Sequence, residues 1–322
     1  MSLLNQTDTS VQEFIIVGFP SFQDSESRNV LFSIFLAVYS LILLGNVLLV
    51  VVFVMDKGLH IPMYMLICSL ALVDLIISTT TIPKMLLVFS FKSTVISVSM
   101  CLTQMGFYHT MIATESLLLG LMAYDRYLAI CKPLHYFTLM SNVVVLQKIS
   151  CCWVLGFLVA IVSVILALKL PFCGPNKLIH CFCDHSAVLK LACTDTFLNS
   201  YVSLAIALSV LFIPLSFILF SYAMIIRSVL NIVSSEGRLK AFSTCGTHLL
   251  IILVFFVIAA GVYISNRVPG TSIDMRIMAA LIQNVTPPLM NPIIYCLRTK
   301  EIRESFVKTL KRCKILSDRS SQ

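Results

Sequence analysis

Residues 29–55, NVLFSIFLAVYSLILLGNVLLVVVFVM, run without a single charged side chain. About 20 consecutive apolar residues are enough for a helix to cross a lipid bilayer. Similar uncharged stretches follow at residues 149–168, 196–226, 241–266 and 277–297. Two further apolar segments, residues 61–83 and 100–124, are each interrupted by one acid. The sequence therefore contains seven candidate membrane-spanning helices.

The composition of the 322-residue chain fits a membrane protein. Hydrophobic residues make up 58% of it and charged residues only 12%, which is far from the balance of a soluble globular domain. No segment alternates in the manner of an outer-membrane strand, and a backbone in lipid must satisfy its own hydrogen bonds. We therefore expect an all-α fold, a bundle of seven transmembrane helices.

The positions of the positive charges indicate the orientation of this bundle. Of the 23 Lys and Arg residues, 15 fall on the side that includes the C-terminal tail, and such an excess marks the cytoplasmic side. We expect an extracellular N-terminus at residues 1–28, a membrane domain at 29–297 and a cytoplasmic tail at 298–322. Attraction to anionic membrane lipids accounts for the net charge of +8, so no nucleic-acid partner is expected.

Both ends of the chain carry recognisable signals. The first 28 residues lack the apolar core of a cleaved signal peptide. Asn5-Gln6-Thr7 is a glycosylation acceptor on the expected outer side, so we expect a sugar on Asn5. In the tail, charged residues alternate with apolar ones from Lys300 to Lys311, which predicts a short amphipathic eighth helix along the membrane surface.

Two acids fall within the predicted spans, where they need a special environment. Asp74 and Glu115 are acids at membrane depth, which costs several kcal/mol unless the acid is protonated, paired or hydrated. Together with Asn46 and Asn291 they predict an interior polar cluster, which could hold water or a sodium ion. The alternative is that one of the acids is simply protonated because it is desolvated.

The segment MAYDRYLAICKPLHY, from Met122 to Tyr136, places an acid and an arginine side by side at the inner end of the third span. Asp125 and Arg126 can act as a latch that holds the arginine while the bundle is closed. A simpler interpretation is that both are interfacial charges that reach towards water.

These motifs occur together with others that resemble one receptor family. They are Gly45-Asn46, LHIPMY at residues 59–64, MAYDRYLAIC with PLHY, Ser221-Tyr222, KAFSTCGTHL at residues 240–249 and PPLMNPIIY at residues 287–295. Over nearly the whole chain the sequence resembles the odorant receptors, a branch of the rhodopsin-like G-protein-coupled receptors. CLTQMGFYH at residues 101–109 resembles the fish-like class I group, whereas Asn266-Arg267 departs from the His-Arg common there.

The resemblance implies a function, two disulfides and a set of switching residues. The protein would bind a small volatile or water-soluble organic ligand and activate a stimulatory olfactory-type G protein, which raises cyclic AMP. Cys101 would bridge Cys183, Cys173 would bridge Cys193, and Cys181 would remain as the odd thiol. By their match to the inner motifs, the residues expected to switch or to contact the G protein are Asp125, Arg126, Tyr222, Lys240 and Tyr295.

The ligand is expected in the outer half of the bundle, between the third, fifth, sixth and seventh spans, where helical bundles build pockets. Helical spacing selects one face on each span. The candidate ligand-binding residues are Tyr108, His109, Ile112, Ala113 and Ser116; Ile206, Ser209 and Val210; Ala260, Tyr263 and Arg267; and Met278, Leu281 and Ile282.

Arg267 has two possible roles. A guanidinium at the mouth of an apolar cavity can bind a carboxylate with two parallel hydrogen bonds, which predicts a small aliphatic acid as the ligand. Alternatively, Arg267 is an interfacial anchor paired with Asp274 or Asp184.

Other functions were weighed against a receptor. A non-olfactory chemosensory receptor is a close alternative, because sequence does not record tissue. A transporter or channel is disfavoured, since the spans show no inverted repeat and no ring of pore charges. An enzyme is not expected, because no hydrolase or phosphate-binding motif is present. The string His180-Cys181-Phe182-Cys183-Asp184-His185 contains soft metal ligands, but a bridged Cys183 would leave too few of them, so no metal is expected.

Overall fold

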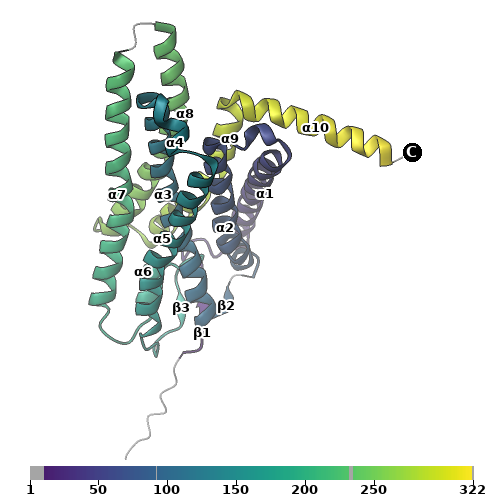
Figure 1. The fold of residues 1–322 in the computed structure, drawn as a ribbon. Helices are drawn as coiled ribbons and strands as arrows, with labels where there is room; N and C mark the ends of the chain where they lie inside the picture. The colour runs from purple at the N-terminus through teal and green to yellow at the C-terminus, as the bar shows by residue number, and fades with distance from the viewer. Residues whose placement is uncertain (1–10, 92, 232–234, 321–322) are drawn as a thin grey trace, which may run out of the picture.

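The computed structural model describes residues 11–91, 93–231 and 235–320, apart from the side chains of residues 235–244, 310 and 312–320. In the part described, seven long helices stand side by side as a bundle, and one more helix points away from it (Figure 1). The seven are α1 (Ser25–Met55), α2 (Pro62–Phe91), α3 (Val98–Cys131), α5 (Asn142–Leu168), α7 (Phe197–Leu230), α8 (Ser235–Arg267) and α9 (Ile273–Arg298). Each overlaps one predicted span, so the predicted seven-helix bundle is confirmed.

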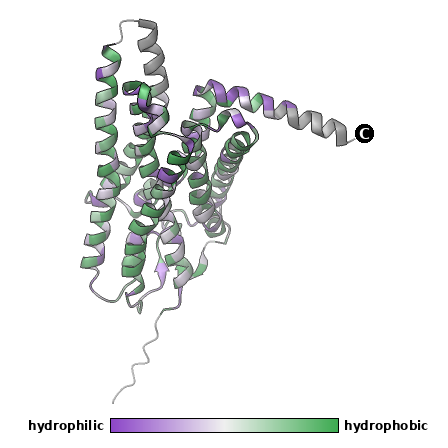
Figure 2. Cartoon of the chain, in the orientation of Figure 1, coloured by the Kyte–Doolittle hydropathy of each residue, from purple (hydrophilic) through white to green (hydrophobic). Residues whose placement is uncertain are grey.

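The helices of the bundle are hydrophobic along most of their length (Figure 2), and many of their large apolar side chains are exposed. By length and composition, five helices within the described residues can cross a membrane: α1, α2, α5, α7 and Cys245–Arg267 of α8. The two remaining helices, α3 and α9, carry more polar residues. On α3 the acids Glu115 and Asp125 are each only 1% exposed, so the charge lies inside the bundle and the lipid-facing surface remains apolar.

Several helices begin where a small polar side chain caps the first turn. Asp24 accepts a hydrogen bond of 2.7 Å from the backbone nitrogen of Ser27 at the start of α1. Ser97, Ser141 and Ser272 do the same at the starts of α3, α5 and α9. Ser and Asp are strong N-cap residues because their oxygens satisfy backbone N–H groups that the helix leaves unpaired.

A small sheet closes the outer end of the bundle, and no pattern in the sequence predicts it. Its central strand β1 (Glu13–Ile16) pairs antiparallel with β2 (Thr94–Ser97) and parallel with β3 (Lys177–Leu178). Phe14 and Ile16 alternate inward and are fully buried. Strands of four and two residues are too short to show a diagnostic alternation, and their pairing partners lie far away in the sequence.

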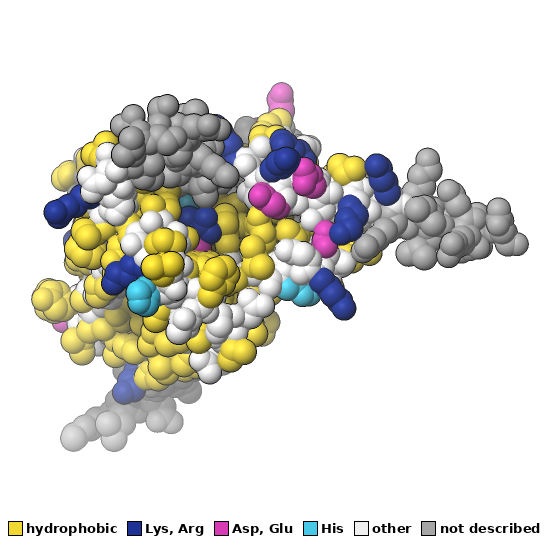
Figure 3. Space-filling view, turned by 45° about the horizontal axis from the view of Figure 1, so that its top comes forward, with side chains coloured by type: hydrophobic (Ala, Val, Ile, Leu, Met, Phe, Trp, Pro, Cys, Tyr) yellow, Lys and Arg dark blue, Asp and Glu magenta, His cyan; other side chains and the backbone are white. Residues whose placement is uncertain are grey.

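The inner end of the bundle carries two short helices and the amphipathic helix that the tail sequence predicts. Residues Lys57–Leu59 form η1, Pro133–Leu139 form α4 and Lys300–Ser320 form α10. On α10, Ile302, Ser305 and Thr309 are buried against the bundle, whereas charged side chains gather on its outer surface (Figure 3).

Asp56, which caps the end of α1, ties α10 to the bundle. Its carboxylate accepts a 2.8 Å hydrogen bond from the Ser305 hydroxyl and lies 3.2 Å from Nζ of Lys308. The hydrogen bonds from Ser305 and from the Gly58 amide hold the pKa of Asp56 below its usual range. The carboxylate therefore stays charged at neutral pH and keeps this contact.

Candidate functional site

The outer half of the bundle encloses a cavity of about 510 Å³, a size within the range of small-molecule sites. Its walls come from α3, α7, α8 and α9, as expected, and also from α5 and from the loop helix α6 (His185–Leu189). Eight of the candidate ligand-binding residues line it: Tyr108, His109, Ile112, Ala113, Ile206, Val210, Tyr263 and Arg267. Six others lie outside the lining: Ser116, Ser209, Ala260, Met278, Leu281 and Ile282.

Two of the six, both serines, have other contacts. The hydroxyl of Ser116 is fully buried and donates to the carbonyl oxygen of Val210 at 2.8 Å, which joins α3 to α7 beside the cavity. The hydroxyl of Ser209 donates to the carbonyl oxygen of Ala205 in its own helix at 2.7 Å, and its side chain is exposed. Ser116 therefore belongs to the packing around the cavity and Ser209 to the lipid-facing surface.

On α9 the cavity face differs by a small rotation from the one expected. Arg276, Ala280 and Gln283 line the cavity. Leu281 is 1% exposed and packs in the helical core, whereas Ile282 is 44% exposed on the outer surface. Two polar residues of this helix, Arg276 and Gln283, lie on the face that lines the cavity, whereas the expected face was chosen from apolar positions.

The outer loop between α5 and α7 covers the cavity and is held by disulfides. Cys101 at the start of α3 is bonded to Cys183, and Cys173 is bonded to Cys193 within the loop. Both bridges agree with the resemblance. Cys181 is a buried free thiol, as expected for the odd cysteine, and burial raises its pKa.

Two histidines meet where this loop faces the cavity. Nε2 of His185 lies 2.9 Å from the hydroxyl of Ser203 on α7. The ring centroid of His109 on α3 lies 6.1 Å from that of His185. Nδ1 of His109 is buried and has no hydrogen-bond partner among the described residues. Burial lowers the pKa of His185, so at neutral pH it presents an uncharged imidazole to the cavity. The His109 ring lines the cavity, but its Nδ1 is turned into the protein and has no surface exposed there.

The loop sequence that resembled a metal site has other roles. Oδ1 of Asp184 accepts from the backbone nitrogen of Ser186 at 3.0 Å and caps α6. Burial alone would raise the pKa of Asp184, but His180 and the hydrogen bond from Ser186 together hold it below its ordinary value. Within the described residues, no group of three or more His, Cys, Asp or Glu side chains is arranged to hold a metal ion.

The interior polar cluster lies below the cavity and is only partly connected. Nδ2 of Asn291 donates to Oδ2 of Asp74 at 2.9 Å. Asn46 instead donates to the carbonyl oxygens of Ile42 and Pro288. Oδ1 of Asp74, Oδ1 of Asn46 and both carboxylate oxygens of Glu115 are buried without a partner among the described side chains. These are the hard oxygen ligands that a small cation prefers.

At the inner end, the predicted latch residues are in contact. A nitrogen of Arg126 lies 2.7 Å from Oδ2 of Asp125. Oδ1 of the same carboxylate accepts a 2.8 Å hydrogen bond from the hydroxyl of Tyr136 on α4. The Asp125 side chain is 1% exposed and that of Arg126 is 13% exposed, so this arginine is largely withdrawn from the inner surface. Sequence reasoning missed the part played by Tyr136, although it lies within the quoted motif.

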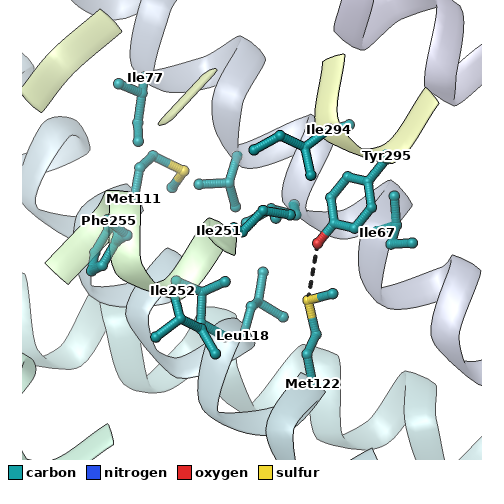
Figure 4. Close-up of a cluster of buried hydrophobic side chains, with 14 of the residues drawn as sticks. Ile67, Ile77, Met111, Leu118, Met122, Ile251, Ile252, Phe255, Ile294 and Tyr295 are labelled. Atoms are coloured by element: carbon teal, nitrogen blue, oxygen red, sulfur yellow. Dashed lines mark hydrogen bonds between the residues drawn. The ribbon is translucent and has the colours of Figure 1, made fainter. Parts of the chain in front are cut away.

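The other switching candidates surround the same region. The hydroxyl of Tyr222 lies 2.6 Å from Nδ1 of His248 and joins α7 to α8. The hydroxyl of Tyr295 lies 3.7 Å from Sδ of Met122, within a cluster of buried apolar side chains (Figure 4). His248 was missed, although KAFSTCGTHL contains it. The side chain of Lys240 and the glycosylation candidate Asn5 lie outside the described residues.

Two large apolar side chains on the inner helix α4 remain uncovered. Leu134 is 92% exposed and Phe137 is 82% exposed. Both follow the latch arginine in the chain, and Tyr136 of the same helix holds the latch acid. Their spacing of three residues places both side chains on one face of α4, where they form a small exposed apolar surface.

Comparison with known proteins gives one consistent answer. The sequence profile described as olfactory receptor matches residues 35–313 of this chain. The chain is 42% identical to human (Homo sapiens) olfactory receptor 6N1 over 309 residues, which cover 96% of this chain and 98% of that one. It is 39% identical to mouse (Mus musculus) olfactory receptor 1M1, with 95% and 97% coverage. To human olfactory receptor 1E1 it is also 39% identical, with 96% and 97% coverage.

Proposed function

Because the chain belongs to the olfactory receptor family, a family of multi-pass membrane receptors that are not enzymes, we propose that it binds a small organic ligand in its outer cavity. Binding then opens the inner end of the bundle and activates a stimulatory olfactory-type G protein, which raises cyclic AMP. One observation carries this proposal. The same helix, α3, contributes His109 to the wall of the outer cavity and Arg126 to the closed latch at the inner end.

The composition of the cavity wall supports a small, partly apolar ligand. Ile112, Val210 and Phe255 supply apolar surface, which gains free energy when a ligand removes it from water. The imidazole ring of His109 supplies a polar group in the cavity wall that would fix the ligand's orientation. A ligand that contacts several helices at once favours the arrangement in which those contacts are best, and so shifts the population of the bundle.

The inner end supports the step to the G protein. In the closed bundle Asp125 engages Arg126. Opening frees this guanidinium for a cytoplasmic partner, and the exposed Leu134 and Phe137 of α4 supply apolar contact area beside it. Tyr222, Lys240 and Tyr295 are the further residues assigned to switching or to G-protein contact.

Replacement of Arg126 tests the proposal. Arg126→Ala is expected to reach the cell surface but to give no cyclic AMP response to any compound that activates the wild type. Lys57→Ala is the control, because Lys57 is an exposed inner residue outside the latch. Full signalling by Arg126→Ala at equal surface display would contradict the assignment.

We place the protein in the plasma membrane with its N-terminus outside, in the cilia of olfactory sensory cells. The same chemistry would serve a chemosensory receptor in another tissue. Detection of the N-terminus by antibody on intact cells tests the orientation, and staining only after permeabilisation would contradict it.

A further inference from the structure

Lys148, near the inner end of α5, is a half-buried lysine that contacts two other helices. Its Nζ donates a 3.2 Å hydrogen bond to the carbonyl oxygen of Leu139, the last residue of α4, and lies 3.4 Å from Sδ of Met140. The same nitrogen lies 4.6 Å from the ring centroid of Tyr124 on α3. One side chain therefore joins α3, α4 and α5.

The ammonium of Lys148 has no acid directly beside it. Among the described residues, no carboxylate lies within ion-pair distance of Lys148, and Asp125 attracts it from farther away. A cation that partly leaves water loses hydration energy, and a lysine at a helix end normally extends into water instead. The carbonyl oxygen of Leu139 and the face of the Tyr124 ring compensate for this loss, since both attract a cation. These contacts hold the side chain inward.

The part of α4 that Lys148 contacts is continuous with the latch. The hydroxyl of Tyr136 donates to Asp125, and the carbonyl oxygen of Tyr136 accepts a 2.8 Å hydrogen bond from the backbone nitrogen of Met140. Helix α4 is thus attached to α3 at two points, through Tyr136 on Asp125 and through Lys148 on Tyr124. A helix of seven residues is too short to be stable alone, so these attachments determine where it lies.

We infer that Lys148 is a positioning residue for G-protein activation, which fixes the exposed apolar face of α4, formed by Leu134 and Phe137, relative to the latch on α3. This inference rests on the proposed function. A surface that is already in place before its partner arrives binds more tightly than one that must be ordered during binding, because ordering opposes association. Lys148 therefore acts on the G protein without having to touch it.

Titration of the heterotrimer tests this role. GDP release is followed with purified receptor and a saturating concentration of a compound that activates the wild type. In Lys148→Met, which removes the charge, the G-protein concentration that gives half-maximal release should rise at least about threefold. The maximal rate and the affinity for the compound should stay unchanged, and Lys148→Arg should restore most of the loss. Lys57→Met is the control, because Lys57 is an exposed lysine at the same end of the bundle.

Variants of Tyr124 test the contact between the cation and the ring. Tyr124→Phe keeps the ring face and should behave as the wild type, whereas Tyr124→Leu should reproduce much of the effect of Lys148→Met. The double variant of Tyr124→Leu and Lys148→Met should lose little more, because both changes remove the same contact. An unchanged half-maximal concentration in Lys148→Met, or equal effects of the two Tyr124 changes, would overturn the inference.

Hydrogen exchange measures the placement of α4 without any G protein. In Lys148→Met the backbone amides of Leu139 and Met140 should exchange several-fold faster than in the wild type, while those of α2 should not change. Unchanged exchange at the end of α4 would overturn the positioning role whatever the signalling result. If exchange becomes faster but the wild type never accelerates GDP release, the positioning of α4 is supported and the proposed function is contradicted.

Discussion

The hydroxyl of Tyr136 on α4 donates a 2.8 Å hydrogen bond to Oδ1 of Asp125, whose other oxygen binds Arg126 at 2.7 Å. One carboxylate thus joins a short inner helix to the residue assigned to G-protein contact. The hydrogen bond orients the carboxylate and favours the closed latch, because a hydrogen bond to a charged group contributes about 1.5–3 kcal/mol.

Tyr136→Phe should therefore raise the ligand-independent activity of the receptor. Loss of this hydrogen bond weakens the closed state, and we expect basal cyclic AMP to rise by up to roughly tenfold at equal surface display. Tyr127→Phe is the matched control, because the hydroxyl of Tyr127 makes no hydrogen bond to the described residues and its ring lies 6.0 Å from Nζ of Lys132. An unchanged basal signal in Tyr136→Phe would show that the contact does not hold the latch.

Gly156 marks the closest approach of α5 to α3, and substitution there should disturb folding. A Cβ at this position would collide with Oγ1 of Thr114 and lie 3.0 Å from the carbonyl oxygen of Thr110. Overpacking of this kind costs about 1–3 kcal/mol, so Gly156→Ala should lower surface expression and the melting temperature. Gly261→Ala, whose Cβ meets nothing within 4 Å of the described chain, should be neutral or slightly stabilising. If both variants behave alike, the close packing is not required.

The unpartnered oxygens of Asp74 and Glu115 predict an effect of sodium on stability. If they hold sodium in the closed bundle, the ion-bound state gains free energy with ion concentration. The ligand-free receptor should then melt at a higher temperature in sodium chloride than in choline chloride at equal ionic strength. Asp74→Asn should abolish the difference. Equal melting temperatures of wild type in both salts would favour the alternative, in which one acid is protonated.

The buried histidines of the outer loop lead us to expect that the protein becomes less stable to unfolding as the pH falls. Burial lowers the pKa of His180 and of His185 from the ordinary value of 6.5. Below this value the unfolded chain binds protons that the folded loop does not, so the free energy of unfolding decreases as the pH falls. The melting temperature should drop by about 2 °C or more between roughly pH 7.5 and 5.5.

Neighbouring charges do not change within that interval. The pKa of Asp184 is already below its ordinary value, so its carboxylate stays charged throughout this range. His185→Gln should reduce the pH dependence, whereas His135→Gln, which alters an exposed histidine on α4, should leave it unchanged. A melting temperature that does not vary with pH would contradict the buried, neutral histidines.

Much of the fold follows from local signals in the sequence. Runs of uncharged residues such as 29–55 are long enough to define each span, and the motifs around Arg126 and Tyr295 locate the inner end. What the sequence did not reveal depends on distant backbone partners or on helix rotation. Strand β1 forms because it pairs with β2 near residue 95 and with β3 near residue 177. The local sequence of β1 contains no pattern that identifies these partners.

The residues that line the cavity could likewise be predicted only in part from the sequence. On α3, helical spacing selects a face of which Tyr108, His109, Ile112 and Ala113 line the cavity, whereas Ser116 does not. On α9, the basic residue Arg276 of the first turn lines the cavity, whereas helical spacing had pointed to Met278 in the next turn. The hydrogen bond from Ser21 to Asp274 could not be predicted, because 253 residues separate them in the sequence.

Release of GDP from a purified G protein tests the central claim most directly. The receptor is reconstituted in lipid with a stimulatory olfactory-type heterotrimer, and GDP dissociation is followed with and without a compound that binds the outer cavity. Our account predicts faster release with the compound for wild type and no acceleration for Arg126→Ala. If no compound that binds the wild-type cavity ever accelerates GDP release, the protein does not transmit ligand binding to its inner end, and the account is wrong.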